Sequence, residues 1–278
     1  MENLTPAGAH ASVGVFDSGI GGLSVLREIR ALLPHEDLLY FADSGHAPYG
    51  GKSDAQIVER AQAVAAFLLQ QGVKAMVVAC NTATAAAIDG IRKKYPALPV
   101  VGVEPGLKPG AAATRCGKVG VLATKSTIAS SRFEALRAQV HASTGVEFFS
   151  MPCPGLADKV EEGELDSAST ADLVKGFVQP LLAAGVDTLV LGCTHYPFVL
   201  PLIERECAGR SITLIDTGHA VARQLARLLD QHGLHTESQS AGEIQGFTSG
   251  LPAQLAASLR QLLGLDCQVR AALAEQAA

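Results

Sequence analysis

Two cysteines occupy matching positions in the chain, each directly after an apolar stretch and directly before short polar residues. The first stretch, residues 75–79, leads to Cys80, which is followed by Asn81 and Thr82. This pattern predicts a buried strand that delivers a thiol to the start of a helix. Ligands bind at the carboxyl ends of the strands in open α/β sheets, and a helix N-terminus favours a thiolate over a thiol. An isolated cysteine is more often a small buried hydrophobic residue, so Cys80 needs support from elsewhere in the chain.

The second cysteine supplies that support. Residues 188–192 are apolar and lead to Cys193, with His195 two residues later. A Gly-Val pair stands eight residues before each cysteine, starting at Gly72 and at Gly185. This duplication predicts two similar domains that face each other, with one thiol on each side of the cleft between them.

Strand-like and helix-like stretches alternate along the whole chain, which predicts mostly parallel sheets covered by helices on both faces. The predicted fold class is therefore α/β, with two domains related by a pseudo-twofold axis and an active site in the cleft. We assign residues 12–106 together with 217–278 to the first domain and residues 107–216 to the second. Residues 1–11 are expected to form a disordered tail.

A glycine-rich turn follows the first predicted strand, residues 12–16. Asp17 opens the turn, and the glycines after it expose backbone N–H groups that suit an anion. Ser24 stands where a dinucleotide fingerprint has its third glycine, so the turn does not indicate a nucleotide cofactor. Asp17 on its own would most simply be a helix N-cap.

The composition restricts the class of protein. The 278 residues are 48% hydrophobic, and the net charge of −5 gives no general attraction to nucleic acid or to anionic membranes. There is no apolar run of the roughly 20 residues that a membrane helix needs, and the first eleven residues do not resemble a signal peptide. We therefore expect a soluble, cytoplasmic protein. None of the six cysteines forms a Cys-x-x-Cys pair, so free thiols and no metal site are expected.

Two thiols across a cleft permit three chemistries. A redox disulfide usually carries a Cys-x-x-Cys pair, which this chain lacks. A nucleophilic cysteine with a histidine base would use Cys193 and His195 and leave Cys80 without a role. The third chemistry is a pair of acid/base groups on opposite faces of one carbon, which inverts a stereocentre. An amino-acid α-carbon is a weak acid, so such a site must stabilise a carbanion by electrostatics and desolvation.

Four motifs follow one another from about residue 13 to 220: residues 15–23, Asp43-Ser44 with Pro48-Tyr49-Gly50, residues 80–83, and residues 192–197. In this order and at these spacings they resemble the glutamate racemase family. The resemblance implies interconversion of L- and D-glutamate by two bases without pyridoxal phosphate or metal, in the service of bacterial peptidoglycan (cell wall) synthesis. It also implies a homodimer, and L- or D-glutamate as the small-molecule partner.

The resemblance also implies roles for individual residues. Cys80 would deprotonate D-glutamate with help from Asp17, and Cys193 would deprotonate L-glutamate with help from His195. The second helper carboxylate of the family follows a Cys-Pro stretch, and counting from that stretch places it at Glu161. Glu162 is adjacent, and Ala157-Asp158 departs from the usual apolar-Pro pair, so this assignment is the least specific. The implied substrate-binding residues are Asp17, Ser18, Tyr49, Gly50, Asn81, Thr82, Thr124, Thr127, Thr194 and His195.

Three alternatives remain at this point. A racemase of the same superfamily that acts on aspartate or a hydantoin shares the two cysteine motifs. A non-catalytic protein that binds an acidic amino acid would not need its thiols. A thiol oxidoreductase would form a reversible disulfide between the two cysteines.

Overall fold

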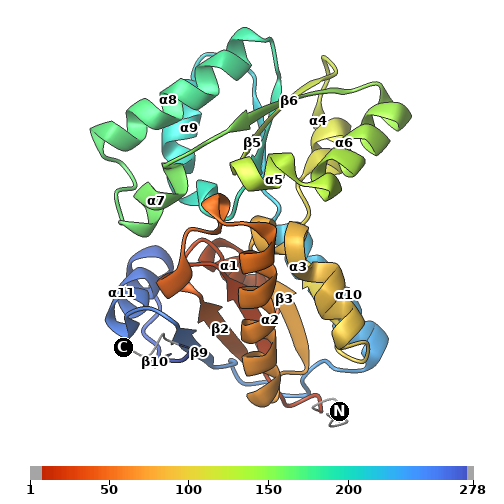
Figure 1. The fold of residues 1–278 in the computed structure, drawn as a ribbon, viewed down its shortest axis with the longest axis vertical. Helices are drawn as coiled ribbons and strands as arrows, with labels where there is room; N and C mark the ends of the chain where they lie inside the picture. The colour runs from red at the N-terminus through yellow and green to blue at the C-terminus, as the bar shows by residue number, and fades with distance from the viewer. Residues whose placement is uncertain (1–7, 274–278) are drawn as a thin grey trace.

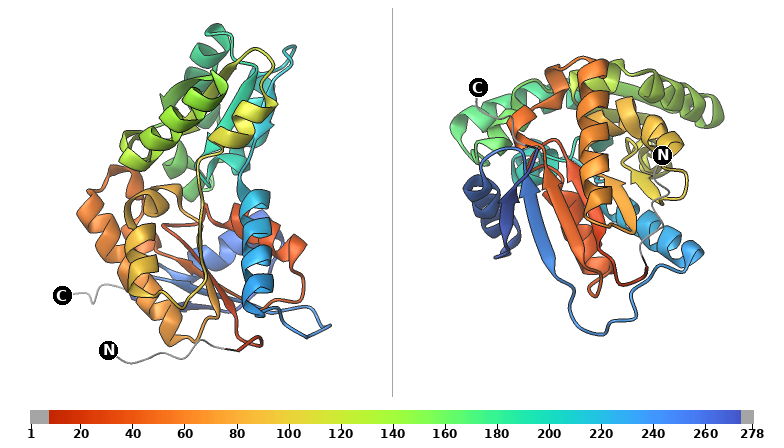
Figure 2. Two further views of the ribbon diagram at one scale, coloured as in Figure 1. Left: turned by 90° about the vertical axis from the view of Figure 1, so that its right-hand side faces the viewer. Right: turned by 60° about the horizontal axis from the view of Figure 1, so that its bottom comes forward.

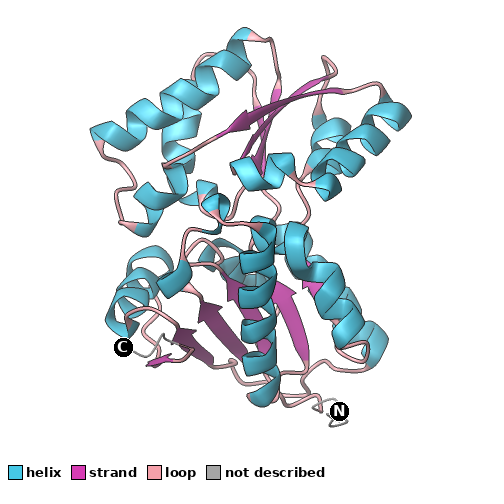
Figure 3. Cartoon of the chain, viewed as in Figure 1, coloured by secondary structure: helices cyan, strands magenta, loops and turns pink. Residues whose placement is uncertain are grey.

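Two parallel β-sheets, one above the other in Figure 1, organise the chain. The computed structural model describes residues 8–273. The larger sheet has six strands in the order β10-β9-β2-β1-β3-β4, and the smaller sheet has four in the order β6-β5-β7-β8. Neighbouring strands in both sheets are parallel, and helices cover both faces of each sheet (Figure 3). The predicted α/β fold with two mostly parallel sheets is confirmed.

The strands of both sheets are short. Those of the larger sheet are β1 (Val13–Asp17), β2 (Leu38–Ala42), β3 (Ala75–Val78), β4 (Val100–Gly102), β9 (Ile244–Thr248) and β10 (Val269–Ala271). Those of the smaller sheet are β5 (Lys118–Ala123), β6 (Glu147–Pro152), β7 (Thr188–Gly192) and β8 (Thr213–Ile215).

Helices connect most of the strands. They are α1 (Leu23–Leu32), α2 (Asp54–Gln70), α3 (Asn81–Lys94), α4 (Leu107–Ala113), α5 (Lys125–Ala129), α6 (Ser131–Thr144), α7 (Leu156–Glu161), α8 (Ala168–Ala183), α9 (Leu200–Glu206), α10 (Gly218–His232) and α11 (Pro252–Leu263), with 3₁₀ turns η1 (Ser44–His46), η2 (Tyr49–Gly51) and η3 (Tyr196–Val199).

The register of the strands brings the chemistry-bearing residues to the edges of the sheets. Asp17, the last residue of β1, pairs with Ala42 of β2, and the preceding residue pairs with Val78 of β3. Asp43 directly follows β2, and Cys80 lies two residues after the end of β3. The smaller sheet repeats this arrangement, because Ala123 of β5 pairs with Gly192 of β7, next to Cys193.

The C-terminal segment returns to the larger sheet. β9 pairs with β2, and β10 pairs with β9, so the blue strands in Figure 2 lie beside the red ones. Strands of the larger sheet lie within residues 13–102 and 244–271, and those of the smaller sheet lie within residues 118–215. The domain boundaries at 106/107 and 216/217 stay a prediction, and this strand membership is compatible with them.

The predicted tail, residues 1–11, lies partly outside the described chain, because residues 1–7 are not described. Residues 8–11 form a turn in which the backbone N–H of Ala11 donates to the carbonyl of Gly8. The ammonium of Lys74 donates to the carbonyl of Ala9, so this turn is attached to the end of the larger sheet.

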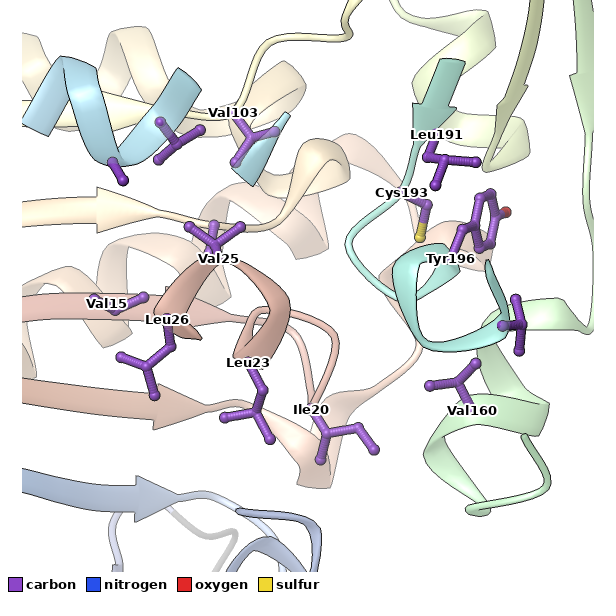
Figure 4. Packing of buried hydrophobic residues seen from close by; sticks show 14 of the residues in the cluster. Val15, Ile20, Leu23, Val25, Leu26, Val103, Val160, Leu191, Cys193 and Tyr196 are labelled. Atoms are coloured by element: carbon purple, nitrogen blue, oxygen red, sulfur yellow. The ribbon is translucent and has the colours of Figure 1, made fainter. Parts of the chain in front are cut away.

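One hydrophobic cluster runs from one sheet to the other. It includes Val15 and Leu26 from the larger sheet and its first helix, and Leu191 from the smaller sheet. Figure 4 shows the boundary between the two parts, where Ile20 faces Val160 of α7. Both side chains belong to the same buried cluster, so apolar packing holds the glycine-rich turn against α7.

Candidate active site

Cys80 caps the helix that it precedes. It lies between β3 and α3 with 5% of its surface exposed, and its Sγ accepts a hydrogen bond from the backbone N–H of Ala83 at 3.4 Å. The thiol donates to Ser18 Oγ at 3.6 Å. The predicted strand, thiol and helix N-terminus are confirmed.

The expected preference of Cys80 for the thiolate is wrong. Burial raises the pKa of this thiol far above its ordinary value, and the negative charge of Asp17 raises it further. Hydrogen bonds from the amide of Ala83 and to the hydroxyl of Ser18 lower the pKa, but by less than burial and Asp17 raise it. Cys80 therefore holds its proton at neutral pH.

Cys193 follows β7 and has a histidine beside it. Its Sγ lies 3.5 Å from Nδ1 of His195, and Figure 4 shows the thiol next to Leu191 and Tyr196. The other ring nitrogen of His195, Nε2, lies 2.7 Å from Oε1 of Glu161. The imidazole therefore bridges a thiol and a carboxylate, which is an arrangement that can hold and move a proton.

The environment favours the protonated form of His195. Burial lowers the pKa of this imidazole, but hydrogen bonds to Cys193 and Glu161 and the charges of those groups raise it more. The net pKa lies well above the ordinary value of 6.5. At neutral pH an imidazolium therefore stands 3.5 Å from the sulfur of Cys193.

Contacts from both halves of the molecule fix the position of Glu161. It is the last residue of α7, and its Oε1 accepts a hydrogen bond from the backbone N–H of Ile20 at 2.8 Å. The neighbouring Glu162 points elsewhere and pairs with Lys159 at 3.3 Å on the surface. Of the two adjacent carboxylates, the one next to His195 is thus Glu161.

Asp17 is fully buried and has one free oxygen. Its Oδ2 accepts from the backbone N–H groups of Gly22 at 2.9 Å and Gly19 at 3.3 Å, so the carboxylate does hold the glycine-rich turn. Its Oδ1 has no hydrogen-bond partner among the described residues. Burial raises the pKa of Asp17, although the positive charge of His195 opposes this shift. Asp17 is therefore not the N-cap of α1, whose N-cap is Gly22 without a side-chain cap bond; it ties the turn together instead and presents an uncommitted oxygen within electrostatic reach of Cys80.

A cavity of about 310 Å³ brings the two cysteines together. The amide of Asn81 borders it, is 95% buried and has no hydrogen-bond partner on either atom among the described residues. An unpaired buried amide is costly unless a ligand satisfies it. Of the predicted site residues, those that line the cavity are Ser18, Tyr49, Gly50, Cys80, Asn81, Thr82, Thr124, Cys193, Thr194 and His195.

Three predicted site residues stand behind the cavity wall. Asp17 and Glu161 reach it through the thiol and the imidazole described above. Thr127 is 99% buried, and its hydroxyl bonds to Thr124 at 2.9 Å and lies 3.4 Å from that of Thr82. The hydroxyls of Thr82 and Thr124 also lie 3.0 Å apart, so these three threonines join the start of α3 to the start of α5.

Tyr49 borders the cavity, but its hydroxyl is committed elsewhere. It donates to Asp43 Oδ2 at 2.6 Å, and Arg60 binds both oxygens of the same carboxylate at 3.0 and 2.8 Å. Ser249, the residue after β9, donates from its Oγ to Asp43 Oδ1 at 2.7 Å. Asp43 is fully buried, so this network fixes the Tyr49–Gly51 turn that forms one wall of the cavity.

Some residues at the cavity were not expected from the sequence. Cys153 was treated as an ordinary thiol, yet it lines the cavity, and burial raises its pKa to about 12. Lys125 and Asp158 also border the cavity and bring one charge of each sign to it. Arg60 and Ser249 were missed because nothing near them in the sequence indicates a shared partner.

Two further properties concern residues 8–273. No group of three or more His, Cys, Asp or Glu side chains in this range is arranged to hold a metal ion. No helix in the described chain is both long and apolar enough to cross a membrane.

Comparison with known proteins places this geometry in a family. Residues 14–225 match the family model described as Asp/Glu/Hydantoin racemase. The chain is 54% identical over 261 residues to the glutamate racemase of Ectopseudomonas mendocina, and the match covers 94% of this chain and 98% of that protein.

Solved structures agree with this match. A glutamate racemase isoform of Bacillus anthracis has a TM-score of 0.85 at 33% identity, and the glutamate racemase of Francisella tularensis, solved with D-glutamate, has a TM-score of 0.83 at 31% identity. Each match covers 95% of this chain and 98% of the solved one. This chain therefore belongs to the Asp/Glu/Hydantoin racemase family and, within it, to the glutamate racemases.

Proposed function

We propose that this protein interconverts L- and D-glutamate, with Cys80 and Cys193 as the two acid/base groups. One observation carries the proposal: two buried thiols from matching strand ends line a single cavity, and each has its own ionisable neighbour. The names of the relatives and the D-glutamate bound to the Francisella protein support glutamate as the substrate.

The raised pKa values of Cys80 and His195 suit a reaction that starts from L-glutamate. The Cys193 thiolate beside the His195 imidazolium removes the α-proton, and an S–H bond forms as the C–H bond breaks. The electron pair stays on the α-carbon as a carbanion. The Cys80 thiol, whose pKa is raised, then gives its proton to the opposite face. The products are D-glutamate, a Cys193 thiol and a Cys80 thiolate, and the D-to-L reaction runs through the same steps in reverse.

The remaining cavity residues would hold the substrate and stabilise the carbanion. Hydroxyl and amide groups of Ser18, Asn81 and Thr194 and the backbone of Gly50 are donors for the two carboxylates. Thr82 and Thr124 occupy the same wall. Cys80, Asn81 and Cys193 are each more than nine-tenths buried, so these donors act in a low dielectric, where they lower the free energy of the developing negative charge.

The wider assignments follow from the family resemblance. We infer that the protein supplies D-glutamate for peptidoglycan synthesis, works in the cytoplasm as a homodimer, and has no nucleic-acid or membrane partner. We further assign residues 12–106 with 217–278 to one domain and 107–216 to the other. Analytical ultracentrifugation tests the dimer, and a monomer at micromolar concentration would contradict it.

The decisive experiment measures racemisation of glutamate and aspartate by circular dichroism in wild type, Cys80→Ser and Cys193→Ser. We expect turnover of glutamate and a loss of at least about a thousandfold in each variant, with unchanged far-UV spectra. Turnover of aspartate alone would favour the related racemases, and retained turnover in either variant would remove the two-thiol scheme. Cys116→Ser is the control, because that thiol is exposed and outside the cavity.

A further inference from the structure

Tyr40 is a buried residue to which neither the reaction scheme nor the cavity assigns a role. It lies in the middle of β2 with none of its surface exposed. Its hydroxyl donates a hydrogen bond to the carbonyl oxygen of Gly19 at 2.7 Å. Gly19 belongs to the glycine-rich turn that follows β1, so the contact runs from the core of the larger sheet to the wall of the active site.

The carbonyl that Tyr40 holds belongs to the peptide unit between Gly19 and Ile20. The opposite end of that unit, the N–H of Ile20, donates to Oε1 of Glu161 at 2.8 Å. A peptide unit is planar and rigid. A donor that fixes the direction of the carbonyl therefore also fixes the direction of the N–H, and with it the place where Glu161 finds its hydrogen bond.

From Glu161 the chain of contacts continues to the second thiol. Its Oε1 lies 2.7 Å from His195 Nε2, and His195 Nδ1 lies 3.5 Å from Cys193 Sγ. We propose that Tyr40 is a positioning residue for the Cys193 half of the site, acting through the Gly19–Ile20 peptide, Glu161 and His195. The proposal rests on the two-thiol function stated above and extends it to a residue on the other sheet.

The surroundings leave this peptide little freedom to find another arrangement. A Cβ on Gly19 would overlap Oε1 of Glu161, and a Cβ on Gly22 would lie 2.9 Å from the hydroxyl of Tyr40. The turn is therefore in contact with Glu161 on one side and Tyr40 on the other. Burial, together with the charges of Asp17 and Glu161, raises the pKa of Tyr40 well above its ordinary value, so the hydroxyl stays a proton donor.

Tyr40 also lies near Cys80 and Asp17, the other half of the site. It could therefore act on that half instead, which is the alternative explanation. A negative charge on Cys80, when this thiol is ionised, also acts on the Tyr40 hydroxyl. Tyr40 could then influence the Cys80 half through Asp17 rather than the Cys193 half through Glu161. The two explanations differ in which proton transfer slows when the hydroxyl is removed.

Isotope effects distinguish the two halves, whereas rates alone do not. The equilibrium constant of a racemisation is one, so any variant lowers kcat/KM equally in both directions. For Tyr40→Phe we expect kcat/KM to fall about five- to tenfold, the effect of misplacing one hydrogen-bonded group. With α-deuterated substrates, the primary isotope effect on kcat/KM should rise for L-glutamate, which Cys193 deprotonates, and fall for D-glutamate.

A second measurement needs no turnover. The ¹⁵N signal of the His195 ring, assigned by its loss in His195→Gln, should titrate at lower pH in Tyr40→Phe because Glu161 is no longer held against it. Tyr95→Phe, a tyrosine outside the site, and Leu38→Val, a core truncation in the same strand, are the controls. Both should keep the wild-type isotope effects and titration.

Defined results overturn the proposal. A rise of the isotope effect for D-glutamate instead would assign Tyr40 to the Cys80 half, and unchanged isotope effects with an unchanged His195 titration would remove it from the site. If the wild type failed to racemise glutamate, the proposed function would fall, while the His195 titration would still test the positioning. Should Tyr40→Phe not fold, Gly19→Ala tests the step from the Gly19–Ile20 peptide through Glu161 to His195, because its Cβ would displace Glu161; unchanged isotope effects and an unchanged His195 titration in that variant would overturn the proposal.

Discussion

The carboxylate of Glu161 and the imidazole of His195 meet at 2.7 Å, although 34 residues separate them and they belong to different elements of the smaller-sheet half. The same carboxylate oxygen accepts the N–H of Ile20 from the other half. One atom therefore joins the helper of Cys193 to the turn that carries Asp17. The protonation and orientation of the His195 ring therefore depend on how the two halves pack against each other.

Replacing Glu161 with Gln is expected to lower kcat about ten- to a hundredfold, because a charge-assisted hydrogen bond becomes a neutral one. Gln keeps an oxygen for the N–H of Ile20, so the fold should be retained. Steady-state racemisation measures the effect. Glu162→Gln is the matched control, since that side chain pairs with Lys159 on the surface, and equal losses in the two variants would contradict the role of Glu161.

The stability of the protein should fall as the pH rises above about 6.5. The pKa of His195 is higher in the folded protein than its ordinary value of 6.5, so the folded state binds more protons than the unfolded state in this range. The free energy of unfolding then decreases with increasing pH. Urea unfolding from pH 6.5 to 8.5, below the ordinary thiol value of 9.0, measures the slope.

Glu161→Gln is the control for that slope. It removes a charge that raises the pKa of His195, so the pH dependence should become shallower while stability at pH 8.5 changes less than at pH 6.5. A wild-type stability that stayed constant or increased across this range would contradict a raised pKa for His195.

Local patterns in the sequence were enough to predict the strands that carry Cys80 and Cys193 and their parallel arrangement. The signal for each strand is short-range, since an apolar run followed by polar residues marks a strand end wherever it occurs. The position of Glu161 came only from a count after Cys153-Pro154 in the family pattern. Its contact with Ile20 joins residues 141 positions apart, and no periodicity indicates such a pair.

The ionisation of Cys80 could not be predicted from the sequence. A helix N-terminus lowers a thiol pKa, and the sequence indicates that helix, and the family resemblance places Asp17 beside the thiol, but neither shows how deeply the sulfur is buried. Desolvation depends on the whole tertiary structure and here outweighs the helix. The Asp43 network was missed for the same reason, because Ser249 is 206 residues from its partner.

Arg60→Met should destabilise the protein by on the order of 3 kcal/mol, because it removes the guanidinium that binds both oxygens of the buried Asp43 carboxylate. Urea unfolding measures the loss, and adding Asp43→Asn should recover part of it. The KM for glutamate should also rise, since the Tyr49–Gly51 turn loses a constraint. Arg137→Met removes an exposed pair with Glu134 and should leave stability unchanged; similar losses in both variants would argue against the buried network.

Two glycines at the active site should respond differently to alanine. A Cβ on Gly21 would overlap the ring of His195 and lie 2.6 Å from Thr194 Oγ1, whereas a Cβ on Gly51 would meet nothing within 4 Å. Displacing a catalytic group by about 1 Å costs roughly a hundredfold in rate. We therefore expect Gly21→Ala to lose about that much kcat and Gly51→Ala to remain close to wild type in the same racemisation assay. Wild-type kcat in Gly21→Ala would mean that the turn can move without disturbing His195, and the contact from Ile20 through Glu161 would then not control the imidazole.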